Sequence, residues 1–350
     1  MCNTLDVVAP RRVRPASEHQ PGGMAQVRSK GKRSGPTGLE GIVDIVGAPA
    51  AVLPWLDRFY DDRDAALLEV LAAGPMSVCS LAAESAAFDP ATVLRAHRRA
   101  VVTIVDERDP GSRVEVAPFW ERFGYWILFE GWRDIPDEAQ GAISEGYLQY
   151  YTDDIAVAVA DVKAGRPISD DTDPYHYVLY REAQDLARGS QRAFVRPCPC
   201  RRTFKHCDAP VDVCLWFEED ERGVGWEISR ERALELLAEA ERAALTFTSN
   251  ATEPGSASWI CCCCSDCCLP ILAAEKLDAA ALWPGRRHVM TVDHDLCTRC
   301  RACVKRCPFD ALTMDGKGKD GVLKLDADAC RGCGVCETSC KDGAIAMAEL

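Results

Sequence analysis

Eight cysteines near the C-terminus of this 350-residue chain have a spacing that suits iron–sulfur chemistry. They form two runs with the same pattern, C-x2-C-x2-C-x3-C, and Pro308 follows the first run. The runs are Cys297, Cys300, Cys303 and Cys307, and then Cys330, Cys333, Cys336 and Cys340. One such run could bind zinc, but two of the same spacing favour two [4Fe–4S] clusters whose fourth ligands are exchanged. We therefore expect Cys307 to join the second cluster and Cys340 to join the first.

The sequence around these runs is itself repeated. A short β-rich stretch precedes each run, at 289–293 and at 322–326, and a turn of helix and a strand follow the first. Residues from about 288 to 350 therefore resemble the two-cluster bacterial ferredoxin family, with all eight ligand positions filled. Two departures touch no ligand: Lys341 replaces a proline that often follows the last cysteine, and the connector at 316–321 is somewhat long.

Ten more cysteines lie between residues 198 and 268, in two groups. The first group is Cys198, Cys200, Cys207 and Cys214, and the second is Cys261, Cys262, Cys263, Cys264, Cys267 and Cys268. On a helix, Cys261, Cys264 and Cys268 would share one face, whereas on a strand neighbouring side chains point apart. Six thiols in eight residues cannot all reach one cubane, so some are spare or serve a second centre. A helix capped by Ser229, at about 230–244, joins the two groups.

Three interpretations of these thiols are open. We favour at least one further Fe–S cluster with ligands from both groups. The candidate metal ligands are then Cys198, Cys200, Cys207, Cys214, Cys261, Cys263, Cys264, Cys267 and Cys268. The alternatives are a structural zinc at 198–214 with reactive thiols at 261–268, and thiol–disulfide chemistry without metal. Arg201, Arg202, Lys205 and His206 would lower thiol pKa values and raise the potential of a cluster there.

The segment at about 55–118 has the pattern of a small helical module with a hairpin. Helices are predicted at 64–73, 78–85 and 90–100, with Asp89 as N-cap, and strands at 101–105 and 114–116. This order resembles a winged helix-turn-helix, whose third helix would carry Arg95, His97, Arg98 and Arg99. These residues could meet phosphates, but a net charge of −13 favours a module that docks protein, with nucleic acid an unlikely partner.

The composition points to a reducing compartment. The chain has 20 cysteines but no apolar run of the roughly 18 residues that a membrane span requires, so we expect a cytoplasmic protein that keeps its thiols for metal. Residues 1–40 are basic and rich in Gly, Pro and Ser, which is typical of a disordered tail or of a true start at Met24. The aromatic residues at 119–195 are expected to form core.

The expected fold is α+β with several domains: a winged-helix-like module at 55–118, a cysteine-rich middle domain at 119–285 and a ferredoxin-like 2[4Fe–4S] domain at 288–350. The middle domain has the arrangement C-x-C-R…C…C plus C-x-C-C-x2-C-C, downstream of the winged-helix-like module and upstream of the ferredoxin-like domain. This arrangement resembles that of a group of bacterial and archaeal 4Fe–4S dicluster proteins over residues 55–350. That resemblance implies a redox role beside larger oxidoreductases. Cys262 occupies a spacer position in it and is not expected to be a ligand.

We expect an electron-transfer protein, either a carrier or a subunit of an oxidoreductase, which serves a redox partner protein. The chain has no Rossmann glycine fingerprint and no P-loop, so an independent enzyme is less favoured. Two alternatives stay open: a redox-sensing transcription regulator, and an oxidoreductase with its catalytic metal centre at 198–268.

Overall fold

A computed structural model describes residues 38–106, 109, 111–167, 175–219, 221–251, 258–316 and 320–350. The expected basic tail at 1–40, Met24 included, lies almost wholly outside these residues. The chain forms two compact units, of which the first contains Met1–Gly146 and Glu221–Val224 and the second contains Tyr147–Asp220 and Gly225–Leu350. Helix α7 (Asp137–Lys163) begins in the first unit and continues into the second.

The first unit contains the three helices and the hairpin that the sequence predicts. The helices α3 (Asp62–Leu71), α4 (Val78–Glu84) and α5 (Pro90–Arg98) begin at capping side chains, which include Asp89 as expected. The strands β1 (Met76–Ser77), β2 (Val102–Ile104) and β3 (Arg113–Val116) form an antiparallel sheet in the order β1-β3-β2. Shorter segments precede and follow: η2 (Gly38–Ile42), α1 (Val43–Val46), η3 (Ala50–Trp55), α2 (Leu56–Phe59), η4 (Ala86–Phe88) and η5 (Glu221–Gly223).

The aromatic residues at the start of the expected middle domain are core of this first unit. Helix α6 (Phe119–Phe129) buries Phe119, Phe123 and Trp126 against Phe59 of α2, with ring centroids 4.6–6.3 Å apart. Arg122 is buried among them and donates to the carbonyl oxygens of Phe59 at 2.8 Å and Arg99 at 3.1 Å. Because α6 packs here, the residues at 119–146 group with the helical module.

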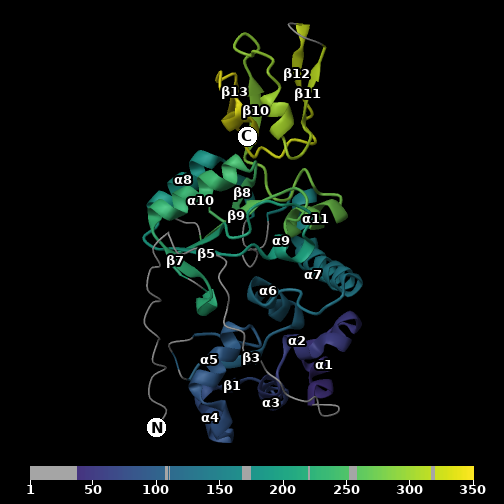
Figure 1. Cartoon of the computed structure of the whole chain (residues 1–350), viewed down its shortest axis with the longest axis vertical. Helices are drawn as coiled ribbons and strands as arrows, with labels where there is room; N and C mark the ends of the chain where they lie inside the picture. Colours follow the sequence, from purple (N-terminus) through teal and green to yellow (C-terminus); the bar gives the residue numbers. More distant parts are fainter. Residues whose placement is uncertain are drawn as a thin grey trace. The chain divides into compact units, whose positions relative to one another are not determined.

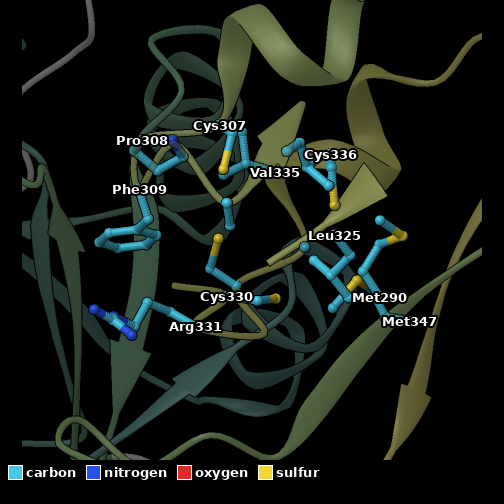
Figure 2. Close-up of a pocket in the computed structure, with 14 residues that line it drawn as sticks. Met290, Cys307, Pro308, Phe309, Leu325, Cys330, Arg331, Val335, Cys336 and Met347 are labelled. Carbon is cyan, nitrogen blue, oxygen red and sulfur yellow. The ribbon is translucent and has the colours of Figure 1, made fainter. Parts of the chain in front are cut away.

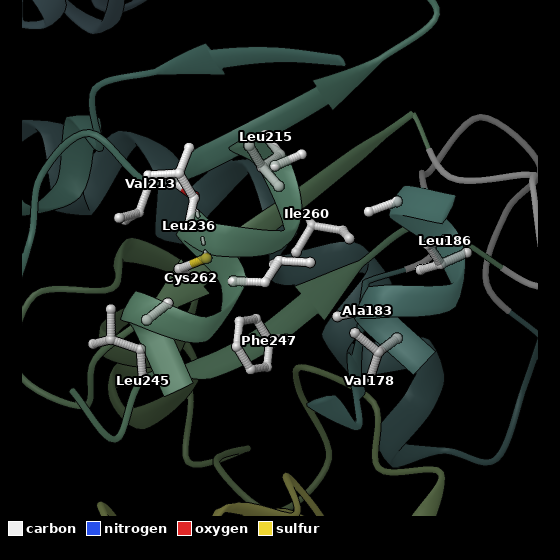
Figure 3. Packing of buried hydrophobic residues seen from close by; sticks show 14 of the residues in the cluster. Val178, Ala183, Leu186, Val213, Leu215, Leu236, Leu245, Phe247, Ile260 and Cys262 are labelled. Carbon is white, nitrogen blue, oxygen red and sulfur yellow. Dashed lines mark hydrogen bonds between the residues drawn. The ribbon is translucent and has the colours of Figure 1, made fainter. Parts of the chain in front are cut away.

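The second unit is built on a six-stranded antiparallel sheet in the order β4-β8-β9-β6-β5-β7. Its strands are β4 (His176–Val178), β5 (Ala193–Arg196), β6 (Cys214–Phe217), β7 (Trp226–Ile228), β8 (Thr246–Ser249) and β9 (Trp259–Cys263). Helices α8 (Tyr180–Gly189) and α10 (Arg230–Arg242) cover one face (Figure 1), and α10 begins at Ser229 as predicted. Leu186, Leu236, Phe247 and Ile260 pack in the core between them (Figure 3).

A second apolar cluster joins α7 to α11 (Leu269–Lys276) and contains Leu148, Ile155, Ala273 and Trp283. The short helix α9 (Pro199–Phe204) contributes Phe204 to it. The helices α9 and α11 each follow a cysteine that is their N-cap residue. Their packing therefore fixes the positions of thiols at the ends of both helices.

The C-terminal part of the second unit has the repeated pattern that the sequence predicts. Two antiparallel strand pairs, β10 with β13 and β11 with β12, are accompanied by two one-turn helices. The elements are β10 (His288–Val292), α12 (Ala302–Arg306), β11 (Leu312–Asp315), β12 (Val322–Leu325), α13 (Val335–Ser339) and β13 (Ile345–Glu349). Over the whole described part of the chain, no helix combines the length and apolar character that crossing a membrane would need.

Candidate metal centres

Two cavities in the C-terminal part are lined by four cysteines each. In the first, Cys307 lies with Cys330, Cys333 and Cys336 beside Phe309 (Figure 2). In the second, Cys340 lies with Cys297, Cys300 and Cys303. The fourth cysteine of each run therefore lies with the first three of the other run, which is the grouping that the spacing leads us to expect.

The backbone of the two runs repeats in detail. Gly332 and Gly334 flank Cys333 with φ of +67° and +76°, and the equivalent Arg299 and Arg301 flank Cys300 with φ of +64° and +63°. These left-handed residues turn the chain so that three successive cysteines face one cavity. At Gly332 a Cβ atom would lie 2.2 Å from the carbonyl oxygen of His288, so that position has no room for a side chain.

Burial makes Cys333 and Cys336 poor acids unless a metal replaces the proton. It raises the pKa of Cys333 to about 12 and raises that of Cys336 as well, with added repulsion from neighbouring thiolates. Metal binding to such thiols releases their protons. Four converging sulfur donors in each cavity match the number that one [4Fe–4S] cluster requires.

Six of the ten cysteines between residues 198 and 268 form a closed ring of neighbouring thiols. Each thiol lies close enough to its two neighbours in the ring that they shift its pKa, and the order is Cys198, Cys200, Cys268, Cys263, Cys261 and Cys214. The ring takes three side chains from each of the two cysteine groups. It therefore joins the two groups in one site.

Strand geometry explains how the ring forms. Along β9, Ile260 and Cys262 face the core under α8 and α10, so Cys261 and Cys263 point to the opposite face. Leu215 of β6 pairs with Ile260, and one step further along this register Cys214 lies opposite Cys261. The other ring members lie on or beside helix starts, since Cys198 and Cys268 are the N-cap residues of α9 and α11.

Two thiols at opposite positions of the ring favour the charged form. Hydrogen bonds from Cys200 and Cys214 hold the pKa of Cys198 well below its usual value, and those from Cys261 and Cys268 do the same for Cys263. The four donating thiols have raised pKa values, because losing the proton would break these bonds. Burial opposes the charge on Arg201, but the nearby thiolates, that of Cys198 first, raise its pKa above the usual value.

Polar side chains that the sequence did not single out surround the ring. The hydroxyl of Thr248 lies 3.4 Å from Sγ of Cys263 and donates to the Tyr175 hydroxyl at 3.1 Å. Burial, and then the charge on ring cysteines, raises the pKa of Tyr151, Tyr175 and Tyr177. The sequence predicts these tyrosines only as core. The cross-strand pairs Tyr177–Thr248 and Thr248–Cys261 place Tyr177 on the ring face, and these pairs depend on strand order.

Three further cysteines form a separate group, which we call the triad: Cys207, Cys264 and Cys267. Their sulfur atoms all lie within 4.8 Å of one another. The structure thus separates Cys207 from Cys198, Cys200 and Cys214, although the four form one array in the sequence. Hydrogen bonding, first from the Cys267 thiol, lowers the pKa of Cys264 to about 6.

Cys262 belongs to neither the ring nor the triad. It is 1 % exposed and lies in the apolar core with Val213 and Leu236 (Figure 3). Its thiol donates to the carbonyl oxygen of Val213 at 3.2 Å, and burial raises its pKa. This position on the far face of β9 agrees with the expectation that Cys262 is a spacer.

Comparison with known proteins identifies the C-terminal part. The family model described as 4Fe-4S dicluster domain matches residues 274–344, which contain both four-cysteine runs. No curated protein and no solved structure matches the chain significantly. The match and the paired cysteine cavities together show that this is an iron–sulfur protein with a C-terminal ferredoxin-type 4Fe–4S domain.

Proposed function

We propose that this protein transfers single electrons between two ferredoxin-type [4Fe–4S] clusters, a third Fe–S centre at the six-thiol ring, and a redox partner protein. The ligands would be Cys297, Cys300, Cys303 and Cys340 for one ferredoxin cluster and Cys307, Cys330, Cys333 and Cys336 for the other. The reducing cytoplasm is the compartment that suits so many thiols.

The observation that carries this proposal is the position of Phe309. This side chain lines the cavity of Cys330 and Cys333, and it also packs against Cys263 and Cys268 of the ring. Tyr177 lies beside it, close enough to Cys268 and Cys333 that charge on either thiol raises its pKa. Phe309 and Tyr177 thus lie beside thiols of both sets, and electrons could pass from one centre to the other through them.

Several contacts between β4, α8, α10 and the ferredoxin-type part support a fixed spacing of the two centres. Leu179 packs against Gly334, because a Cβ added at Gly334 would lie 2.6 Å from Cδ2 of Leu179. Glu182 lies 3.4 Å from Nε2 of His288, and Arg306 lies 3.0 Å from Glu241. A fixed distance between redox centres keeps the rate of electron transfer uniform.

The size of the ring favours a cluster over a single ion. A tetrahedral metal ion holds at most four thiolates, at about 2.3 Å for zinc. Among the described residues, the one set of three sulfur atoms that meets within 4.8 Å is the triad, and no three ring sulfurs do so. Six thiols spread around a wider perimeter suit a polynuclear iron–sulfur centre, in which each iron takes its own thiolate.

The first unit is proposed to be a winged-helix-like module that docks a protein partner. In its third helix, Arg95 and Arg99 form ion pairs with Asp61 and Asp64, the closest at 2.6 Å. His97 is 3 % exposed, and its Nδ1 accepts from the backbone of Ile104 at 3.0 Å. Side chains bound within the module contribute little to phosphate binding, so the electron-transfer role is preferred to a transcription regulator.

Metal analysis of the full chain after anaerobic reconstitution tests the third centre. Two ferredoxin clusters contain about eight irons, so a ring cluster raises the total to about twelve or more per chain. Replacing Cys263 by Ser should remove this excess and its EPR signal, while both ferredoxin signals persist. The matched control is Cys262→Ser, on the same strand but facing the core, which should keep all the iron. A stable total of eight irons in the unmodified chain would contradict the third cluster.

A further inference from the structure

We propose that the triad of Cys207, Cys264 and Cys267 binds one zinc ion, separately from the iron–sulfur ring. The sulfur of Cys207 lies 3.5 Å from that of Cys264 and 3.7 Å from that of Cys267. Thiolates about 2.3 Å from a tetrahedral zinc ion are about 3.8 Å from one another. Two of the three sulfur–sulfur distances therefore already match a single zinc ion, and the third, between Cys264 and Cys267, lies within 4.8 Å.

The same distances disfavour an iron–sulfur cube at the triad. In a [4Fe–4S] cluster each thiolate binds a different iron and points away from the centre of the cube, so its ligand sulfurs are widely spaced. The triad sulfurs all lie within 4.8 Å of one another, which leaves room between them for one ion. Zinc is a common occupant of such thiolate sites.

Backbone hydrogen bonds support each triad sulfur as a thiolate. The sulfur of Cys207 accepts from the N–H of Ala209, that of Cys264 accepts from the N–H of Cys267, and that of Cys267 accepts from the N–H of His206 at 3.3 Å. Hydrogen bonds to charged acceptors are stronger than neutral ones, and such contacts orient metal ligands. A donor for every sulfur is the arrangement that a preformed thiolate site needs.

The triad lies between the segments that carry the ring. Cys207 follows α9, and Cys264 and Cys267 occupy the turn between β9 and α11. A metal ion here ties the end of α9 to the start of α11, whose N-cap residues Cys198 and Cys268 are ring members. Because the free energy of metal binding adds to folding stability, zinc would stabilise the frame of the ring without joining its redox chemistry.

The fourth zinc position is left to a water molecule. Among the residues that the structure describes, no fourth His, Cys, Asp or Glu side chain meets all three sulfurs within 4.8 Å. The imidazole of His206 instead forms a hydrogen bond through Nδ1 with the carbonyl oxygen of Asp266 at 2.9 Å. Its backbone N–H, and not its imidazole, serves the triad, so His206→Ala should keep the zinc.

The test is zinc and iron content of the full chain, made anaerobically with both metals supplied. We expect one zinc per chain, and a zinc affinity at least 10-fold lower in Cys207→Ser by chelator competition. Cys207→His should restore zinc binding, because imidazole is also a zinc ligand. Cobalt in place of zinc should give thiolate-to-cobalt absorption in the unmodified chain but not in Cys207→Ser. Iron content and EPR signals should be unchanged in all these proteins, which also shows that they fold.

Three results would overturn the proposal. An unmodified chain without zinc, in which Cys207→Ser loses iron, would make the triad part of a cluster. Zinc that survives in both Cys207→Ser and Cys267→Ser would place the ion elsewhere. Absence of zinc with full iron in every variant would leave the triad as free thiols. None of these results depends on whether the ring holds a cluster, so this inference and the proposed electron transfer can fail separately.

Discussion

The aromatic side chains of Phe309 and Tyr177 meet edge to face, with their centroids 6.0 Å apart and their planes at 76°. Edge-to-face pairs of this kind add about 0.5–1.5 kcal/mol beyond the area that they bury. Phe309 packs against the cluster of Cys263, Cys268 and Ile271, and it also lines the cavity of Cys333. Its packing therefore bears on both stability and the proposed path for electrons.

Replacing Phe309 by Ala should slow electron exchange between the ring centre and the second ferredoxin cluster, because a void replaces the aromatic contact. The loss of stability should lie below the about 3–5 kcal/mol of a fully buried phenylalanine, since Phe309 is half-buried. Freeze-quench EPR after rapid reduction would measure the rate. Equal rates in both proteins would show that electrons do not cross at Phe309.

Tyr177→Phe is the matched control. The Tyr177 hydroxyl is buried, and within the described ranges of the chain it has no hydrogen-bond partner. Removing it keeps the aromatic ring and takes away an unsatisfied polar group, so stability should stay equal or rise slightly. The rate of electron exchange should not change, and the chemical unfolding midpoint would measure the stability.

If the two cysteine runs exchange their fourth ligands, replacing the fourth cysteine of one run should damage the cluster of the other run. Cys307→Ala should damage the cluster of Cys330, Cys333 and Cys336 first, since Cys307 lines that cavity. Cys340→Ala should instead damage the cluster of Cys297, Cys300 and Cys303. EPR of the two variants should show complementary losses. If each variant lost the cluster of its own run, the crossed ligand assignment would be wrong.

Gly332→Ala should abolish the second ferredoxin cluster. The added Cβ would lie 2.2 Å from a backbone oxygen, which cannot move aside as a side chain can. Gly343→Ala is a matched control, because it has a similar φ of +66° but no atom within 4 Å of the added Cβ. It should cost only the about 1–2 kcal/mol of the left-handed conformation. Iron content and thermal unfolding would compare the two variants.

The ring and the triad predict different lesions for two nearby thiols. Cys200→Ala should remove the spectroscopic signal of the ring centre, because Cys200 links Cys198 to Cys268. Cys264→Ala should remove zinc and leave that signal in place. Metal content and EPR on the two variants would be measured together. An identical lesion in both would mean that all nine thiols serve one shared centre.

The ion pairs of Asp61 and Asp64 with the third helix should make the first unit sensitive to acid. Although burial raises the pKa of Asp61, hydrogen bonds from the backbone of Asp64 and the charges of Arg99 and Arg95 lower it below its usual value. A lowered folded pKa contributes stability above the unfolded value, near 3.8, and this stability is lost as the pH falls through the folded value. Because Asp61 is partly exposed, the contribution should be at most about 1 kcal/mol.

Asp61→Asn keeps a capping side chain but removes the charge, so its stability should fall less in acid than that of the unmodified chain. Amide hydrogen exchange in α3 would report this locally.

Alanine at Arg95, Arg98 and Arg99 should likewise loosen the module and leave any affinity for duplex DNA weak and unchanged. Nanomolar DNA binding that falls steeply with salt and is lost in this triple variant would instead favour the regulator.

The helices of the first unit and the grouping of the C-terminal cysteines could be predicted from sequence, because both depend on local signals. Asp89 and Pro90 mark a helix start within one turn, and the eight-cysteine spacing reflects two short loops. The ring could not be predicted, since Cys214 and Cys261 become neighbours only through the pairing of β6 with β9. The separation of Cys207 from its array depends equally on where α9 ends.

The four consecutive cysteines at 261–264 do not themselves determine the register of β9 against its neighbouring strands. If β9 slipped by one residue against β8, thiols would still face both sides of the sheet, but Ile260 would leave the core and Cys264 would leave the triad. The choice of ligands thus rests on the apolar residues beside the run and not on the cysteines. Substitutions at Ile260, which bears no donor atom in its side chain, could therefore exchange one set of metal ligands for another.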